Sequence, residues 1–170
     1  MDRRLTLVTA LLGSTLCACA SASNASAPAA SERQLGRCQP AFRLLTQQLG
    51  MAAEISVDTV SDWRTHLQLP GCRITAAGSI APGPEDYQAE SFFNSVRAAG
   101  WTRTPDPRDM PNESAIRFRM NDVDCFFNRY LGIMIGSTEE MRVNAAYRGR
   151  AGDSRFNVMV QCVEALPAAP

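Results

Sequence analysis

Apolar and polar residues alternate most regularly in the second half of the chain, which predicts strands there. Ile116, Phe118 and Met120 alternate with arginines, the pattern of a strand with one face in the core and one in water. Asn121 and Asp122 are typical turn residues, so we expect a hairpin at this point. Further strands with the same period are expected, in chain order, over 72–80, 123–130, 141–147 and 155–163.

Apolar residues at helical spacing predict three helices. Between Glu85 and Ala99, the side chains of Phe92, Phe93 and Val96 form one apolar face, and carboxylates in the first turn suit the positive end of the helix dipole. Two shorter helices are expected nearer the N-terminus, over 40–49 and 58–67.

The order of these elements is short helices, a strand, a helix and then several strands joined by hairpins. It predicts an α+β fold with a mostly antiparallel sheet of four to five strands, a helix over about 85–99 packed on one face, and short N-terminal helices. The chain has 170 residues, 45% of them apolar, which is enough for one such domain. We place this single globular domain at 32–170.

The N-terminal residues have the order of a secretory signal peptide. A short charged start precedes a mostly apolar run at 5–16, which is shorter than the about 20 residues that cross a bilayer. We therefore assign 1–19 to a signal peptide that ends at or near Cys19. Residues 20–31 are mostly Ala and Ser without an apolar period, so we expect a flexible tether there.

Leu16-Cys17-Ala18-Cys19 resembles the lipobox of bacterial lipoproteins, in which a Leu stands three residues before a Cys that is lipidated and becomes the mature N-terminus. The match holds at Leu16, Ala18 and Cys19 and departs at Cys17. The resemblance implies a lipid on Cys19 and, because Ala20 follows, an outer-membrane location facing the periplasm. The alternative is ordinary cleavage after Ala18-Cys19-Ala20, which would release a soluble periplasmic or secreted protein.

Four cysteines remain in the domain, namely Cys38, Cys72, Cys125 and Cys162. An even number in an exported protein predicts two disulfides. Of the three pairings we favour Cys125 with Cys162, since both lie on late strands of one expected sheet, which leaves Cys38 with Cys72. A zinc site or a redox pair is the alternative, but the chain has no C-x-x-C, so no metal or cofactor is expected.

The balance of basic and acidic residues indicates which kinds of partner to expect. The chain has 17 basic and 17 acidic residues, so it lacks the positive charge that draws nucleic acid, and no nucleic-acid partner is expected. Arg117, Arg119 and Arg129 could form a basic stripe on the solvent face of the hairpin that holds an anionic glycan or a carboxylate. Asp122 and Asp124, on the same hairpin, could instead neutralise these arginines as cross-strand pairs.

Candidate catalytic residues are few. His66 is the only histidine, and Asp62 stands four residues before it, the spacing of an acid–base pair or of a surface charge pair on a helix. The chain lacks the common motifs of hydrolases, metalloproteases and nucleotide-binding proteins. Gly132 and Gly136 frame the apolar run 133–135, which is more typical of a bulge or a tight contact than of a ligand cradle.

These observations together predict a cell-envelope lipoprotein with a non-catalytic binding or accessory domain. Its partners would be the membrane, through the lipid anchor, and an envelope protein or glycan. One alternative is an inhibitor of a secreted hydrolase, with an exposed loop at 102–113 or 136–141. The other is an enzyme of unknown class built around His66, Asp62 and a distant Ser or Glu.

Overall fold

The computed structural model describes residues 26–62, 65–104 and 115–166, with backbone only for 26–28. The signal peptide, Cys19, residues 20–25 of the expected tether and most of the loop 102–113 lie outside these ranges. The elements are α1 (Ser26–Arg43), the π-helix η1 (Leu44–Gln48), β1 (Ala52–Asp62), β2 (Leu67–Ile80), α2 (Glu85–Ala98), β3 (Thr102–Arg103), β4 (Ala115–Met120), β5 (Val123–Tyr130), α3 (Thr138–Ala146) and β6 (Ser154–Glu164).

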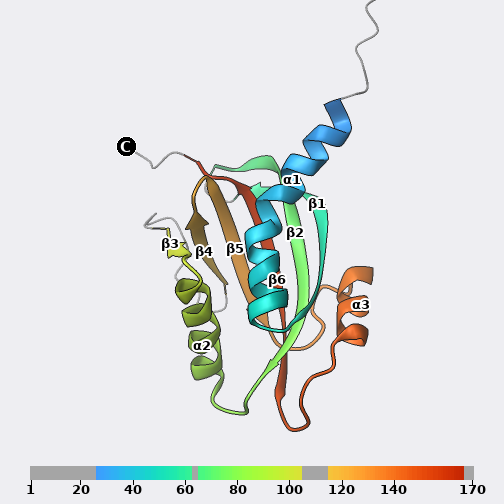
Figure 1. Cartoon of the computed structure of the whole chain (residues 1–170), viewed down its shortest axis with the longest axis vertical. Coiled ribbons are helices and arrows are strands. Elements are labelled where there is room, and N and C mark those ends of the chain that lie inside the picture. The colour runs from blue at the N-terminus through green and yellow to red at the C-terminus, as the bar shows by residue number, and fades with distance from the viewer. Residues whose placement is uncertain (1–25, 63–64, 105–114, 167–170) are drawn as a thin grey trace, which may run out of the picture.

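The strands form one antiparallel sheet of six, in the order β1-β2-β6-β5-β4-β3 (Figure 1). The predicted α+β class with an antiparallel sheet is confirmed, and so are α2, the hairpin of β4 and β5, and β6. The sheet is larger than expected, because β1 and the two-residue β3 join its two edges.

One face of the sheet is covered by α1 and α2. Figure 1 shows α1 crossing in front of β2 and β6. From α2, Phe92 packs on Phe127 and Phe156 with ring centroids 6.5 and 5.8 Å apart, and Phe93 stacks on Phe118 at 6.0 Å. These aromatic contacts join the helix to three strands, β4, β5 and β6, and form the centre of the core.

The opposite face of the sheet carries α3. Arg142 of α3 donates to the carboxylate of Glu54 on β1 at 2.8 Å, and Asn144 donates to the side chain of Asn157 on β6 at 2.9 Å. The helix therefore spans the first three strands of the sheet order, and its Glu140 also neighbours Tyr130 at the end of β5.

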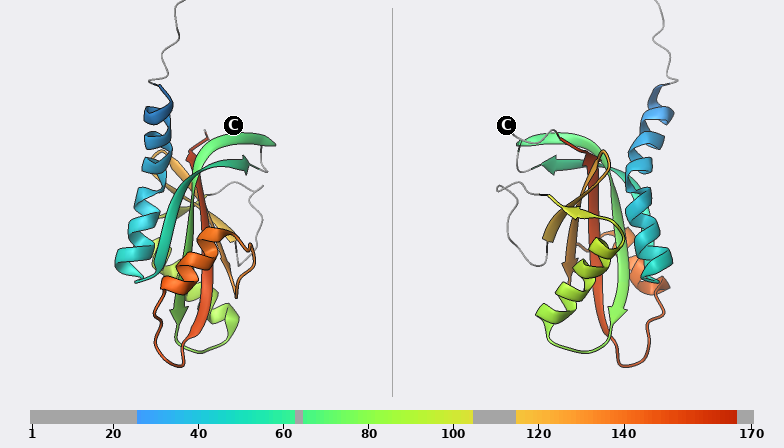
Figure 2. Two further views of the ribbon diagram at one scale, coloured as in Figure 1. Left: turned by 90° about the vertical axis from the view of Figure 1, so that its right-hand side faces the viewer. Right: turned by 60° about the vertical axis from the view of Figure 1, so that its left-hand side comes forward.

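The far ends of β1 and β2 curl over this same face, as Figure 2 shows. We call residues 58–62 and 65–71 the arm. Asp62, at the end of β1, reaches Arg117 on β4, although three strands lie between β1 and β4 in the sheet. Gly71 is at the base of the arm, where a Cβ atom would stand 2.3 Å from the backbone oxygen of Cys162. Only a residue without a side chain fits there.

Two disulfides have the favoured pairing. Cys38–Cys72 joins α1 to β2, and Cys125–Cys162 joins β5 to β6. All four cysteines are fully buried. Each bond closes a loop, with sequence separations of 34 and 37 residues, which is worth roughly 4 kcal/mol by the loop-entropy estimate.

The N-terminal helix is longer than predicted, and the expected tether is correct at most for its first half. Residues 26–31 belong to α1, which continues to Arg43 with Pro40 inside it. Alanine is the best helix former, so an Ala-rich segment next to a docked helix extends that helix. Pro40 has no N–H to donate to the carbonyl of Gly36, so the helix lacks one backbone hydrogen bond at this point.

The helix expected over 58–67 is wrong, because the described residues of this range, 58–62 and 65–67, form the end of β1, a turn and the start of β2. Apolar residues at helical spacing suggested the helix. Pairing of β1 with β2 along eleven residues outweighs this local pattern, and the β-branched Thr59 and Val60 suit a strand.

The strand expected over 141–147 is also wrong, since these residues belong mostly to α3. Ser137 is the N-cap, and its hydroxyl accepts the N–H of Glu140 at 3.2 Å. Glu139 and Glu140 then lie in the first turn, where carboxylates favour a helix.

Candidate functional site

A cluster of buried charges lies under the arm. The guanidinium group of Arg117 donates to Asp62 at 3.1 Å, and the two residues are only 6% and 2% exposed. Beside them Arg119 donates to both oxygens of Asp124, at 2.7 and 2.9 Å, and these two residues face each other across the hairpin. The cluster thus combines two guanidinium groups with two carboxylates.

A small cavity of about 80 Å³ adjoins this cluster. On its floor, Gln161 donates to Asp58 of the arm at 3.0 Å. The charged groups around the cavity bind one another, so the arm is held closed by the same contacts that line the space beneath it. The lining residues are Val60, Ser61, Asp62, Arg117, Asp124, Phe126, Gln161 and Val163.

Arg129 lies on the opposite face of the sheet from Arg117 and Arg119. It forms an ion pair with Glu85 and a hydrogen bond with Gln88 at 3.2 Å, and its guanidinium group stands 4.6 Å from the ring centre of Phe156. The structure therefore does not bring the three arginines of the predicted stripe together. Each has an acidic partner in the chain, and for Arg119 this is the cross-strand aspartate named as the alternative.

The expected pair of His66 and Asp62 does not form on a helix. His66 is exposed in the turn between β1 and β2, with a positive φ of 59°. The carboxylate of Asp62 binds Arg117 and accepts the hydroxyl of Thr65 at 3.2 Å, while only its backbone oxygen accepts the N–H of His66, at 2.8 Å.

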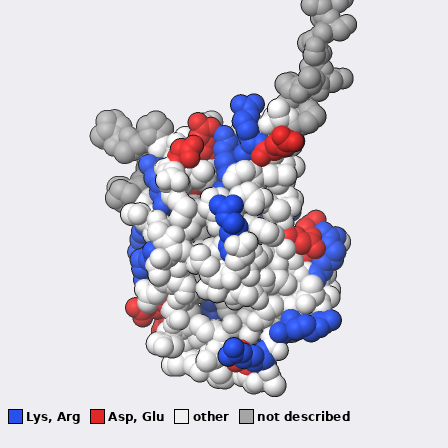
Figure 3. All heavy atoms as spheres, in the orientation of Figure 1, with Lys and Arg blue, Asp and Glu red and all other residues white. Residues whose placement is uncertain are grey.

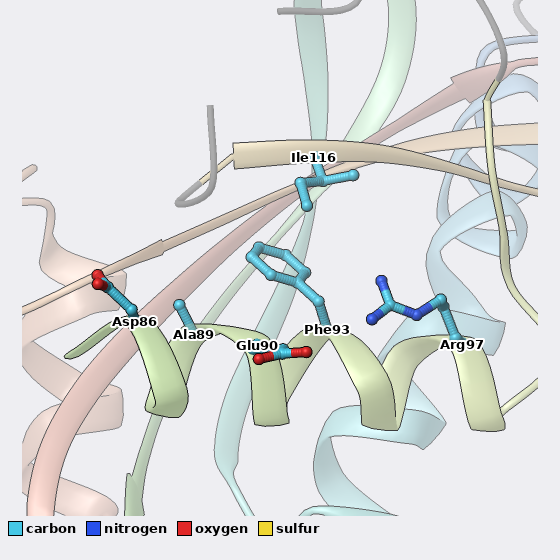
Figure 4. Close-up of a pocket in the computed structure, with 6 residues that line it drawn as sticks. All are labelled: Asp86, Ala89, Glu90, Phe93, Arg97 and Ile116. Carbon is cyan, nitrogen blue, oxygen red and sulfur yellow. The ribbon is translucent and has the colours of Figure 1, made fainter. Parts of the chain in front are cut away.

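A second cavity, of about 220 Å³, lies between α2 and β4. Figure 4 shows Phe93 of α2 pointing toward Ile116 of β4, with Asp86 and Arg97 at opposite ends and Glu90 on the helix between them. Its volume is below the range of about 300–1,000 Å³ typical of small-molecule sites. The cavity has an apolar floor and charged side chains at its rim. These groups do not form an arrangement that is typical of one reaction.

Between β5 and α3 the chain presents apolar side chains to solvent. We call residues 131–135 the apolar loop. Its large side chains, and that of Met141 in α3, are between 40 and 60% exposed. Apolar residues this exposed and this close in sequence mark an interaction surface more often than a random part of the surface. The side chains concerned are Leu131, Ile133, Met134, Ile135 and Met141.

A buried carboxylate holds the apolar loop from inside. Glu140 has no exposed surface, and its side chain accepts the backbone N–H groups of Met134, Ile135 and Gly136 at 3.1, 3.0 and 2.6 Å. Gly132 and Gly136, at the two ends of this stretch, have positive φ angles of 69° and 71°. The backbone therefore curls around the carboxylate, which leaves the side chains to point outward.

The electrostatics favour an ionised Glu140. Burial raises the pKa of Glu140, but the N–H groups of Met134, Gly136 and Ile135 and the neighbouring Tyr130 lower it by more, so that the pKa lies below its usual range. Burial, and then the adjacent Glu140 carboxylate, raises the pKa of Tyr130 far above its usual value. At neutral pH this pair is a charged carboxylate beside a neutral phenol.

The apolar loop and Glu140 were not among the site residues expected from the sequence. The glycine-framed apolar run was visible, and it is a tight backbone arrangement as the glycines suggested. The missing signal was Ser137 followed three residues later by Glu140, the spacing of a capping box at a helix start. Here the side chain of the glutamate accepts N–H groups of the preceding loop.

The described cysteines cannot bind a metal ion as thiolates while they form disulfides. The sulfur atoms of Cys38, Cys72 and Cys162 lie within 4.8 Å of one another, but each belongs to a disulfide and none is a thiolate. Among the described residues, no helix is both long and apolar enough to cross a bilayer.

No family model, curated protein or solved structure matches the chain.

Proposed function

We propose that the chain is a cell-envelope lipoprotein with a non-catalytic binding domain, and that the apolar loop contacts a partner protein. The observation that carries this proposal is the set of exposed apolar side chains held on a backbone that Glu140 fixes from inside. A surface that is ordered before binding loses less entropy when a partner covers it.

The hydrogen bonds of the apolar loop restrict how a partner can recognise it. The N–H groups of Met134 and Ile135 already bind Glu140, so they are not available to pair with an added strand. Recognition must then use the side chains, which favours a partner with an apolar pocket.

The apolar loop is too small to form a stable interface alone. Completing the burial of its half-exposed side chains is worth about 1 kcal/mol each. Association costs roughly 4–15 kcal/mol, so the four side chains of the loop, with Met141 of α3, serve as an anchor and not as a whole interface. The surrounding polar surface, including the ion pair of Arg142 with Glu54, would form the rim.

The charge around the apolar loop favours a protein over a lipid surface. Loops that enter anionic membranes combine apolar residues with Lys or Arg, but residues 131–141 contain two glutamates and no basic residue. Figure 3 shows the other face of the sheet, which carries α1, and there basic and acidic groups are both present among mostly uncharged atoms.

Site-specific crosslinking tests the docking surface. A photo-reactive residue is placed at position 134 and, as a control, at Tyr87, which is 67% exposed on α2. We expect position 134 to give one discrete adduct with an envelope protein, competed by excess wild type and not by the Ile133→Ser/Met134→Ser variant. With the purified partner, that variant should bind at least about tenfold more weakly.

Three results would contradict the docking proposal. These are equal adducts from positions 134 and 87, competition by the variant as good as by wild type, and an adduct of the chain with itself only.

The lipid anchor is tested separately by the mass of the mature protein. A mass with acyl chains on Cys19 supports the lipoprotein, whereas an unmodified N-terminus at Ser21 contradicts it.

An inhibitor of a secreted hydrolase is a narrower form of the same proposal, in which the apolar pocket is an enzyme cleft. Of the loops considered for this role, 136–141 contains the N-cap Ser137 and the first residues of α3, and the exposed apolar side chains lie mostly just before it. Slower turnover by a secreted lysozyme or protease, lost in the Ile133→Ser/Met134→Ser variant, would support the inhibitor.

A further inference from the structure

The two disulfides lie side by side across four elements. Cys162 on β6 is the register partner of Cys125 on β5 and also of Cys72 on β2. The sulfur of Cys72 lies within 4.8 Å of that of Cys162. Because β6 runs between β2 and β5, Cys72 approaches Cys162 from the side opposite to Cys125.

This arrangement is the one that thiol–disulfide exchange requires. A thiolate attacks one sulfur of a disulfide from behind, and the other sulfur leaves. We propose that Cys162 can exchange its partner from Cys125 to Cys72 once a dithiol reductant has opened the Cys38–Cys72 bond. The exchange follows from the placement of the strands and does not depend on the docking proposal.

The atoms and electrons of the exchange balance. The reductant takes up one disulfide as its own oxidised form and leaves thiols on Cys38 and Cys72. The Cys72 thiolate then forms a bond to Sγ of Cys162, the Cys125–Cys162 bond breaks, and Cys125 leaves as the thiolate. This second step involves no net oxidation, so one disulfide is present before and after it.

The sheet can hold the new disulfide without changing its register. Directly opposed residues on antiparallel strands have Cα atoms about 4.5–5.5 Å apart, within the range of about 4.4–6.8 Å that disulfides adopt. Cys72 and Cys162 are opposed in this way and are both fully buried on the face under α1.

The exchange changes how α1 is attached. With Cys38 free, α1 keeps only noncovalent contacts, such as the packing of Ala41 and the ion pair of Arg37 with Glu164 at 2.7 Å. The thiol of Cys125 appears two strands further into the sheet. Reduction of the bond between α1 and β2 therefore ends with a free thiol on Cys125 within the sheet. The helix α1, which follows the expected anchor, is then no longer cross-linked to β2.

The Cys38→Ser variant tests the exchange without any reductant. It leaves one disulfide and one thiol among Cys72, Cys125 and Cys162. The oxidised variant is held at about pH 8.5, where thiols ionise, quenched in acid, labelled with a maleimide and digested. We expect the label to divide between Cys72 and Cys125, with a peptide pair joined through Cys72 and Cys162. Label on Cys72 alone would overturn the proposal.

A pair of double variants provides the matched control. Cys38→Ser/Cys125→Ser leaves Cys72 and Cys162, which we expect to form a disulfide in a glutathione buffer with an unchanged circular dichroism spectrum. Cys38→Ser/Cys162→Ser leaves Cys72 and Cys125 about 10 Å apart across β6, and it should remain a dithiol. A folded first variant that stays reduced, or equal oxidation of both variants, would overturn the proposal.

Discussion

Asp62 and Arg117 are nearly removed from water, so each charge is stabilised by the opposite charge of the other. Taking away one member of a buried pair leaves an uncompensated charge, which costs more than the pair itself contributes. This ion pair holds the arm against the sheet. We therefore expect the loss of one charge to destabilise the protein more than the loss of both.

We expect Asp62→Ala to lower the free energy of unfolding by about 3–5 kcal/mol, because Arg117 stays buried without this carboxylate. Urea denaturation measures the change. The Asp62→Leu/Arg117→Leu variant should recover most of the loss. Glu54→Ala, which breaks the exposed pair with Arg142, is the control and should have a much smaller effect. Equal losses in the two alanine variants would contradict this account of the arm.

Gly71 and Gly78 provide a second test at this scale. A Cβ at Gly71 meets a backbone oxygen at 2.3 Å, whereas one at Gly78 meets the flexible side chain of Met51 at 2.8 Å. We expect Gly71→Ala to cost about 3 kcal/mol or more and Gly78→Ala clearly less, since Met51 can change its rotamer. Thermal and urea unfolding of both variants decide the order, and the reverse order would show that the base of the arm can move.

At the scale of elements, α3 and the apolar loop behave as one unit. The carboxylate of Glu140 belongs to the first turn of the helix and binds the three N–H groups that precede the N-cap. The same residue thus starts a helix, satisfies the backbone of a loop and directs apolar side chains to solvent. This local chemistry is why a segment with an ambiguous apolar pattern is a helix and not a sixth long strand.

Glu140→Gln should destabilise the protein by about 2 kcal/mol or more at neutral pH, because a neutral amide oxygen is a weaker acceptor for buried N–H groups. Amide hydrogen exchange should also be faster at Met134, Ile135 and Gly136. Glu139→Gln, one residue earlier and partly exposed, is the control, with little effect on exchange in the loop.

The effect of Glu140 depends on pH in a defined direction. Its pKa is lower in the folded than in the unfolded chain, so its contribution is complete above the unfolded value of about 4.3 and disappears as the pH falls through the folded pKa. The stability difference between wild type and Glu140→Gln should therefore be constant from about pH 6 to 8 and shrink below about pH 4. A difference that grows in acid would contradict an ionised Glu140.

At the scale of the whole molecule, covalent bonds tie a peripheral helix to the sheet. Cys38–Cys72 fixes α1 on β2, and α1 is the first described element after the expected anchor. If the anchor is present, force on the N-terminus reaches the sheet through this bond. A partner bound at the apolar loop would then be attached to the membrane through the sheet and α1.

We expect Cys38→Ser/Cys72→Ser to lower the free energy of unfolding by about 4 kcal/mol, because the unfolded chain regains the entropy of a 34-residue loop. Hydrogen exchange should increase most in α1, while β5 and β6 stay protected by their own disulfide. Urea denaturation and exchange measured on the same samples test both statements. Uniform loss of protection would mean that α1 and the sheet unfold as one unit.

The sequence by itself determined the elements whose signals are local. The apolar face of α2, the strands β4 and β6, the turn at Asn121 and the two disulfides depend on signals from neighbouring residues, and the structure confirms each of them. The expected solvent face of β4 is wrong at Arg117, which is buried under the arm. The cross-strand pair of Arg119 with Asp124 could be anticipated for the same reason, since a short turn sets the register of a hairpin.

Only the tertiary structure decided the features that depend on distant residues. β1 is a strand because β2 pairs with it, and Asp62 meets Arg117 because the arm curls over the sheet. The same holds for Cys162, which stands between Cys72 and Cys125 only because β6 lies between β2 and β5. Sequence spacing carries no information on strand order, and strand order determines which side chains meet on a sheet face.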